Sequence, residues 1–109
     1  MENKVIQRDV VRGPILGDYV QIESNLQDAD FWLVRTGNSR EVGEPTTKFN
    51  PLHIGIKVTR TDVLLPDYLW WLFVNLYRSG ALYNKCTTVN STKRTINLNT
   101  LRNIPMDVK

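Results

Sequence analysis

The chain contains a single cysteine, Cys86, and a single histidine, His53. One cysteine excludes an intramolecular disulfide and agrees with a reducing compartment such as the cytoplasm. A structural zinc site needs several thiolate or imidazole ligands, and one residue of each type does not supply them. We therefore expect a protein that needs neither a metal nor a cofactor.

Long apolar runs are also missing from the chain. The most apolar stretch, residues 68–76, is interrupted by Asn75 and falls well short of the ~20 apolar residues that span a bilayer. No apolar signal-peptide core follows Met1. The expected protein is soluble and cytoplasmic, makes no membrane contact, and uses its apolar stretch as a core helix.

Acidic residues become scarce toward the C-terminus. Residues 68–109 carry six Lys or Arg and one acid, Asp107, whereas residues 1–67 carry eight Lys or Arg and ten Asp or Glu. This asymmetry is typical of a chain that binds a polyanion, but a basic solvated surface has the same composition. The charge distribution alone leaves both interpretations open.

The length of 109 residues, with 41% hydrophobic and 23% charged residues, predicts a single globular domain. Apolar, β-branched and aromatic patterns predict strands, with a brief strand-like step near the C-terminus and a long loop or irregular hairpin over residues 37–50. The most regular alternation places Ile54, Ile56 and Val58 on one face of a strand. The predicted strands cover residues 5–11, 19–22, 31–36 and 52–59, and the strand-like step covers residues 96–98.

Pro66 and Asp67 predict the start of a helix, because proline suits the first turn and an acid suits the positive end of the helix dipole. Its apolar face is expected to comprise Leu69, Leu72, Phe73, Leu76 and Tyr77. Two adjacent tryptophans widen this face, so we expect cover on more than one side of the helix.

Shorter helices are predicted over residues 81–86 and, capped by Asn97 or Asn99, through residue 102 or 103. Ile104 to Met106 should then leave in an extended form. The predicted fold class is α+β, with a small mixed or antiparallel sheet packed with one main helix (about residues 66–78) and short C-terminal helices.

The residues that could support catalysis have plainer interpretations. His53 is expected to be a structural or surface residue, Cys86 a small packing residue, and Asp28 and Asp30 turn-forming or capping residues. No glycine-rich motif that cradles phosphates is present. The sequence therefore favours a binding domain over an enzyme.

Two polar segments carry the candidate nucleic-acid contacts. Residues 87–95 are rich in Thr, Asn and Ser and are predicted to form an exposed loop, and residues 37–48 form the second segment. Lys and Arg neutralise phosphates, whereas Arg and Asn also pair with base edges in the major groove. The phosphate candidates are Lys48, Lys85, Lys93 and Arg94, and the base-edge candidates are Asn38, Arg40 and Asn90.

Three segments occur in an order that resembles a known family. An acid precedes an apolar strand ending in Arg-Thr-Gly over residues 29–37, Leu-Pro-Asp-Tyr-Leu begins the helix at residue 65, and Ile-Asn-Leu leads to Ile-Pro over residues 96–105. The order is similar to that of the target-recognition domains of type I restriction–modification DNA specificity subunits. The resemblance is strongest over residues 29–106.

This resemblance implies sequence-specific binding of double-stranded DNA through loops of an α+β domain, without catalysis. The chain looks like a shortened, single-domain version, because the long helices that join two such domains in the family are absent. A phage or another mobile element is an expected source of such a miniature.

A second hypothesis is a protein-interaction, anti-restriction or assembly factor that mimics a specificity domain. Such a factor would dock on methyltransferase or restriction subunits, or pair with itself as a homodimer.

Overall fold

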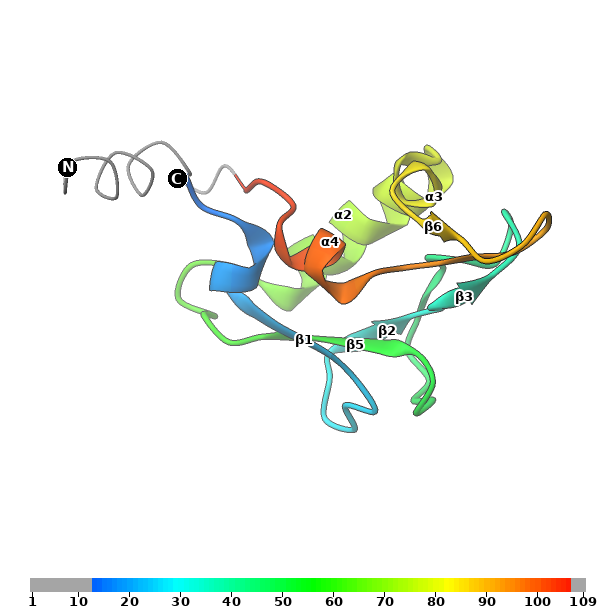
Figure 1. Ribbon diagram of the computed structural model, residues 1–109. Coiled ribbons are helices and arrows are strands. Elements are labelled where there is room, and N and C mark those ends of the chain that lie inside the picture. Colours follow the sequence, from blue (N-terminus) through cyan, green and yellow to red (C-terminus); the bar gives the residue numbers. More distant parts are fainter. Residues whose placement is uncertain (1–12, 107–109) are drawn as a thin grey trace, which may run out of the picture.

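The structure is a computed structural model, and it describes residues 13–106 (Figure 1). These residues form two antiparallel sheets, one main helix and two short helices, which confirms the predicted α+β class. The strand predicted over residues 5–11 lies outside the described residues. The elements in chain order are η1 (Leu16–Asp18), β1 (Val20–Ser24), β2 (Phe31–Leu33), β3 (Thr36–Gly37), β4 (Pro45–Thr46), β5 (Ile54–Val58), α2 (Pro66–Arg78), α3 (Ala81–Asn84), β6 (Thr87–Thr88), β7 (Arg94–Thr95) and α4 (Leu98–Arg102).

The larger sheet has the strand order β1-β5-β2-β4, so β5 lies in its centre. Ile54, Ile56 and Val58 are buried, as the period-two pattern predicts. The strand begins two residues later than predicted. The N–H of His53 donates to the carbonyl oxygen of Asn50 at 3.0 Å and closes a turn there.

The outer face of this sheet is covered by the segment that joins β1 to β2. A Cβ atom added at Gly55 would lie 2.6 Å from Cβ of Leu26 and 3.0 Å from Cβ of Ala29. The indole N–H of Trp32 donates to the carbonyl oxygen of Leu26 at 2.9 Å. Glycine is therefore required in the middle of β5, because the chain crosses directly over it.

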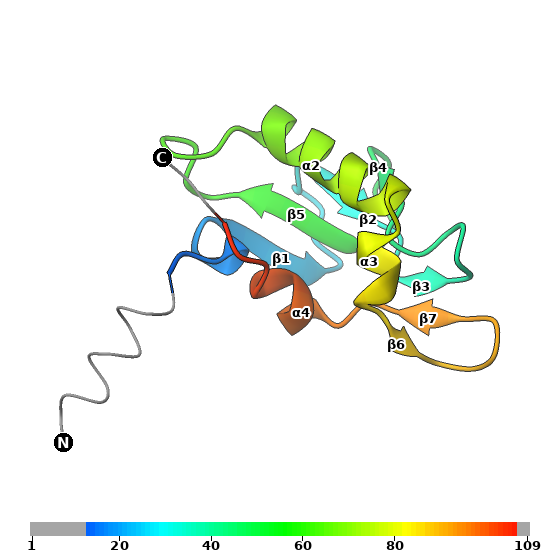
Figure 2. The ribbon, with the colours of Figure 1, turned by 90° about the horizontal axis from the view of Figure 1, so that it is seen from above.

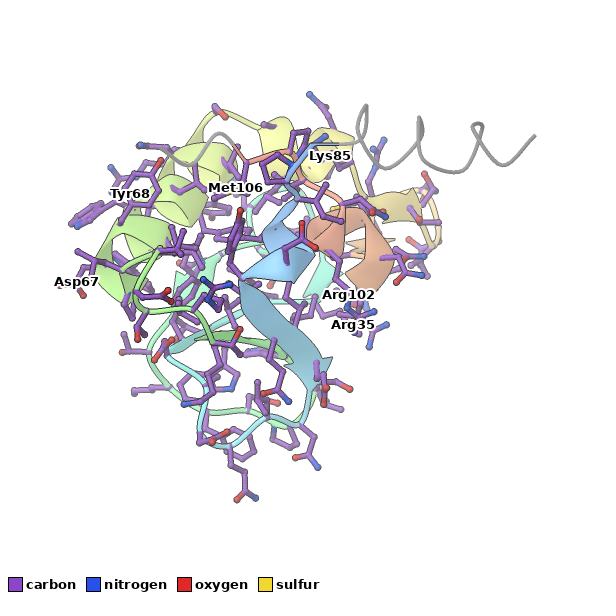
Figure 3. All side chains as sticks on the ribbon, turned by 90° about the vertical axis from the view of Figure 1, so that its left-hand side faces the viewer. Arg35, Asp67, Tyr68, Lys85, Arg102 and Met106 are labelled. Carbon is purple, nitrogen blue, oxygen red and sulfur yellow. The ribbon has the colours of Figure 1, made fainter. Side chains whose placement is uncertain are left out.

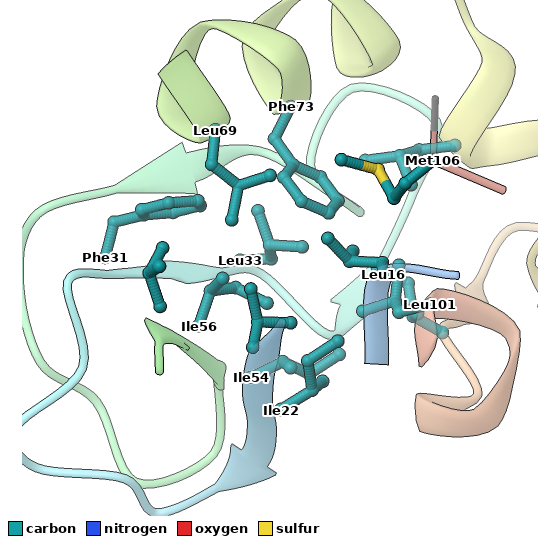
Figure 4. Close-up of a cluster of buried hydrophobic side chains, with 14 of the residues drawn as sticks. Leu16, Ile22, Phe31, Leu33, Ile54, Ile56, Leu69, Phe73, Leu101 and Met106 are labelled. Carbon is teal, nitrogen blue, oxygen red and sulfur yellow. The ribbon is translucent and has the colours of Figure 1, made fainter. Parts of the chain in front are cut away.

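Helix α2 covers the inner face of the same sheet (Figure 4). Leu69 and Phe73 are fully buried against it, and the ring of Phe31 meets Trp70 edge-on with 5.4 Å between ring centroids. The helix has the predicted bounds. It ends before Gly80, whose φ of +82° lies in the left-handed region that favours glycine.

The predicted cover on several sides of α2 holds for one tryptophan and fails for the other. Trp70 is partly buried beside Phe31, whereas 58% of Trp71 remains exposed within the described structure. Trp71 therefore widens the apolar surface of the helix without entering the core. Among residues 13–106, no helix is both long enough and apolar enough to span a membrane.

Helix α4 and the 3₁₀ turn η1 complete the core at the other end, where Leu16, Leu101 and Met106 cluster (Figure 4). The side chain of Asn97 accepts a hydrogen bond from the N–H of Asn99 at 2.8 Å, so Asn97 is the N-cap. The predicted strand-like step over residues 96–98 is correct for its first two residues, because the N–H of Ile96 donates to the carbonyl oxygen of Arg35 and Asn97 is extended. It is wrong for residue 98, where the helix already begins. The extended exit is confirmed, because Pro105 forms an antiparallel β-bridge with Ile15, the residue before η1.

The strand predicted over residues 31–36 is divided between the two sheets. Strand β2 ends at Leu33, and β3 starts at Thr36 in a three-stranded sheet with the order β3-β7-β6. Between them, Val34 exchanges backbone hydrogen bonds with Gly43 and Glu44. The chain therefore turns from one sheet into the other at Val34 and Arg35.

The two polar segments also gain structure. Residues 37–50 contain β4, which pairs with β2, so the irregular hairpin is the correct alternative. Residues 87–95 form the β6–β7 hairpin and not a plain loop. Both segments are consequently anchored in a sheet.

Candidate nucleic-acid interface

The smaller sheet brings the two polar segments together. Strand β3 pairs with β7 through Thr36 opposite Thr95 and Gly37 opposite Arg94, and the two threonine hydroxyl oxygens lie 2.8 Å apart. Figures 1 and 2 both show the turn after β3 and the tip of the β6–β7 hairpin at the same end of the molecule. Segments about 50 residues apart in the sequence thus share one surface.

The turn after β3 is held rigidly. The N–H of Asn38 donates to a carboxylate oxygen of Glu41 at 3.0 Å, and the side-chain oxygen of Asn38 accepts from the N–H of Arg40 at 2.8 Å. Gly43 has a φ of +88°, and a Cβ atom there would lie 3.1 Å from a methyl carbon of Leu82 in α3. The hydroxyl of Tyr77 in α2 donates to the carbonyl oxygen of Arg40. Helices α2 and α3 therefore support the turn from behind.

The tip of the hairpin is organised by Asn90. Its side-chain oxygen accepts from the N–H of Thr92 at 2.9 Å, the hydroxyl of Thr92 at 3.2 Å and the N–H of Lys93 at 2.9 Å. The N–H groups of Val89 and Asn90 both donate to the carbonyl oxygen of Lys93. The side chain of Lys93 is exposed beyond this turn.

These bonds change the expected roles of the two asparagines. Bidentate pairing with adenine requires both the oxygen and the nitrogen of the side-chain amide. The oxygen of Asn38 and the oxygen of Asn90 already accept hydrogen bonds from their own turns. Their main contribution is to the shape of the turns, and Arg40 is the base-edge candidate whose exposed head group remains free within the described residues.

The predicted phosphate contacts have different surroundings. Lys85 is exposed at the end of α3, directly before the hairpin. Arg94 is partly buried, with its guanidinium carbon 4.4 Å from the ring centroid of Tyr83, a cation–π contact. Lys48 lies two residues beyond β4, at the edge of the larger sheet, and does not belong to the smaller sheet. Three of the four cations therefore flank the smaller sheet, and Lys48 lies apart from it.

The residues with catalytic potential have structural partners. A carboxylate oxygen of Asp30 accepts from the N–H of Val58 at 2.8 Å, and Asp28 forms a 3.9 Å ion pair with Lys57. Burial raises the pKa of the Cys86 thiol, against a smaller opposing effect of nearby Arg94. A raised pKa lowers the thiolate fraction, so Cys86 is a poor nucleophile. Residues 13–106 also contain no group of three side chains suited to a metal ion.

The structure adds a concave surface that the sequence pattern does not reveal. Two adjoining hollows of about 470 and about 420 Å³ share Arg35 and Thr95. The first is completed by Thr36, Asn50, Leu52 and His53. The second is completed by Thr87, Ile96, Asn97, Leu98, Asn99 and Arg102. In the sequence, Arg102 belongs to the C-terminal basic set and Arg35 to the cations around the polar segment of residues 37–48. The sequence pattern does not reveal that they are neighbours, because their proximity depends on the break between β2 and β3.

Comparisons with known proteins return nothing similar: no family model matches the chain, and neither a curated protein nor a solved structure is significantly similar to it.

Proposed function

We propose that this chain is a cytoplasmic DNA-binding domain of the target-recognition type, without catalysis of its own. The observation that carries the proposal is the pairing of β3 with β7, which joins the two polar segments and their cations into one surface at one end of the fold. Rigid loops on a folded scaffold are the usual carriers of binding contacts.

The cations that flank this surface suit a duplex. Lys85 and Lys93 are exposed and supply phosphate contacts, with Lys48 as a contact further along the larger sheet. Arg40, at the tip of the braced turn, is the candidate for guanine recognition, because a guanidinium forms two hydrogen bonds with that base. The carboxylate of Glu41 is directed into its own turn and is less able to repel phosphates.

The test is a fluorescence-anisotropy titration with duplex DNA between about 50 and 200 mM salt, the range over which phosphate contacts weaken measurably. Affinity should fall with salt. The double variant Lys85→Gln, Lys93→Gln should reduce the slope of log K against log salt by about 1.8, because each phosphate contact contributes about 0.9.

Lys57→Gln is the matched control, since Lys57 pairs with Asp28 away from both segments. It should leave the slope near that of the unmodified chain. Affinity that is independent of salt, or absent near physiological salt, rejects the proposal.

A protein-interaction role is the second candidate, and one observation favours it. Leu65, Tyr68 and Trp71 are 64%, 58% and 58% exposed and follow one another at three-residue spacing from the N-cap of α2 into the helix. Figure 3 shows Tyr68 on the outer side of the helix. Exposed apolar surface of this kind is typical of an interface, here with a second copy of the chain.

A sizing column with and without duplex distinguishes the two candidates. A dimer that forms without DNA and dissociates in the Trp71→Gln variant supports self-association. A monomer that enters a complex only when duplex is added supports DNA binding.

A further inference from the structure

The two adjoining hollows share the positive charge of Arg35, and no group within the described residues neutralises it. Arg35 is partly buried, and its guanidinium has no hydrogen-bond or ion-pair partner among residues 13–106. None of the residues lining either hollow is an Asp or a Glu. A partly buried, unpaired cation favours an anionic ligand. The hollow already excludes part of the water around the guanidinium, so a ligand has less water to displace.

Arg102 supplies a second guanidinium in a fixed position. One nitrogen donates to the side-chain oxygen of Asn99 at 2.9 Å, and another donates to the carbonyl oxygen of Ile22 at 2.6 Å. These bonds use two of the five N–H donors of a guanidinium. Figure 3 shows Arg35 and Arg102 close together, and both line the second hollow. The site is thus partly preorganised by Arg102, while Arg35 is free to close on a ligand.

The remaining lining groups suit phosphate oxygens. Thr87 and Thr95 contribute hydroxyls, and Asn97 contributes an amide. Arg, Thr and Asn are common donors to the backbone of a nucleic acid. The second hollow has no aromatic lining residue, and the first has only His53, whereas sites that hold unstacked bases use aromatic rings as platforms. The surface therefore suits a backbone phosphate better than a base.

We propose that Arg35 and Arg102 together bind a phosphate group, and that this group belongs to the backbone of the nucleic acid bound by the β3–β7–β6 sheet. This inference rests on the proposed function for the source of the phosphate. It extends the contact surface from the tips of the two segments to the base of the hairpin, where β7 leads into α4.

Arg35→Gln is the decisive variant, because Arg35 has no partner within the described structure and its replacement should leave the fold intact. The slope of log K against log salt should decrease by about 0.9, and affinity should fall equally for every duplex sequence. Arg35→Lys keeps the charge and should retain the slope. Lys57→Gln removes one charge elsewhere and should change neither quantity.

A titration with inorganic phosphate tests the site without DNA. Titration followed by NMR should shift the amide signals of Thr36 and Ile96 saturably in the unmodified chain and not in Arg35→Gln. If the chain binds duplex but Arg35→Gln behaves like Lys57→Gln, the inference is overturned and the proposed function stands.

If the chain binds no duplex, the proposed function fails and the phosphate arm decides the site. Saturable shifts that depend on Arg35 then support a phosphate site with a free phosphate ligand, and unchanged spectra overturn it.

Discussion

Gly55→Ala tests whether the segment joining β1 to β2 is packed onto the central strand. The added Cβ would lie 2.6 Å from Cβ of Leu26, whereas ordinary carbon contacts are about 3.5–4.0 Å. Leu26 must therefore move by about 1 Å. Because its carbonyl oxygen accepts from the indole of Trp32, this movement also strains that hydrogen bond.

The expected cost combines these two effects. Overpacking a well-packed site costs about 1–3 kcal/mol, and weakening a partly buried hydrogen bond adds about 1 kcal/mol. The free energy of unfolding should therefore fall by about 2–4 kcal/mol. For a domain of this size the melting temperature should fall by roughly 10–20 °C.

Chemical denaturation and the NMR signal of the Trp32 indole N–H measure the effect, and a double-mutant cycle assigns its cause. In a Leu26→Gly background, Gly55→Ala should cost at least about 1 kcal/mol less, because the closest of the clashing atoms, those of the Leu26 side chain, are gone. Gly80→Ala is the control: it has a φ of +82° and no atom within 4 Å, so its cost should be the same in both backgrounds. An equal cost for Gly55→Ala in both backgrounds would refute the packing argument.

Three further outcomes are expected. Asn97→Ala removes the N-cap of α4 and should cost about 1 kcal/mol of unfolding free energy in urea denaturation, whereas Asn97→Ser should recover most of it. Cys86 should react with a thiol reagent at pH 8 more slowly than a free thiol, because burial raises its pKa, and the rate should increase on denaturation; rapid labelling of the folded chain would contradict this. Burial and, secondarily, the charge of Glu44 raise the pKa of Tyr77, so the folded state holds this proton more tightly than the unfolded state. The resulting stabilisation is present below the ordinary phenol pKa near 10 and is lost as pH rises through the raised pKa. Tyr77→Phe should abolish that alkaline dependence and cost about 1 kcal/mol at neutral pH by removing the bond to Arg40, as measured by thermal unfolding across pH 7–11.

Local sequence signals predicted the elements whose causes are local. Pro66 and Asp67 mark the start of α2, and its apolar spacing gives the face that carries Leu69 and Phe73, because a helix is determined by residues three and four apart. The sequence places the cap of α4 at Asn97 or Asn99 for the same reason, since a cap bonds only two residues ahead, and the structure selects Asn97. These features were readable from the sequence.

Elements that depend on distant partners were predicted less well. The run of residues 31–36 has uniform strand propensity, yet it divides at Val34 because Gly43 and Glu44 pair with that residue and Thr95 pairs with Thr36. Trp71 is of a residue type that is common in protein cores, but it lies on the side of α2 that does not face the sheet. Propensity does not specify which of two sheets a strand joins.

The candidate interface shows the same division. The sequence by itself determined the α+β class, the main helix and the two polar segments, because composition and periodicity act over a few residues. Only the tertiary structure decided that the segments adjoin, that Asn38 and Asn90 shape their turns, and that Arg35 and Arg102 line one hollow. These arrangements arise from pairing across about 60 residues of chain, and no local pattern encodes them.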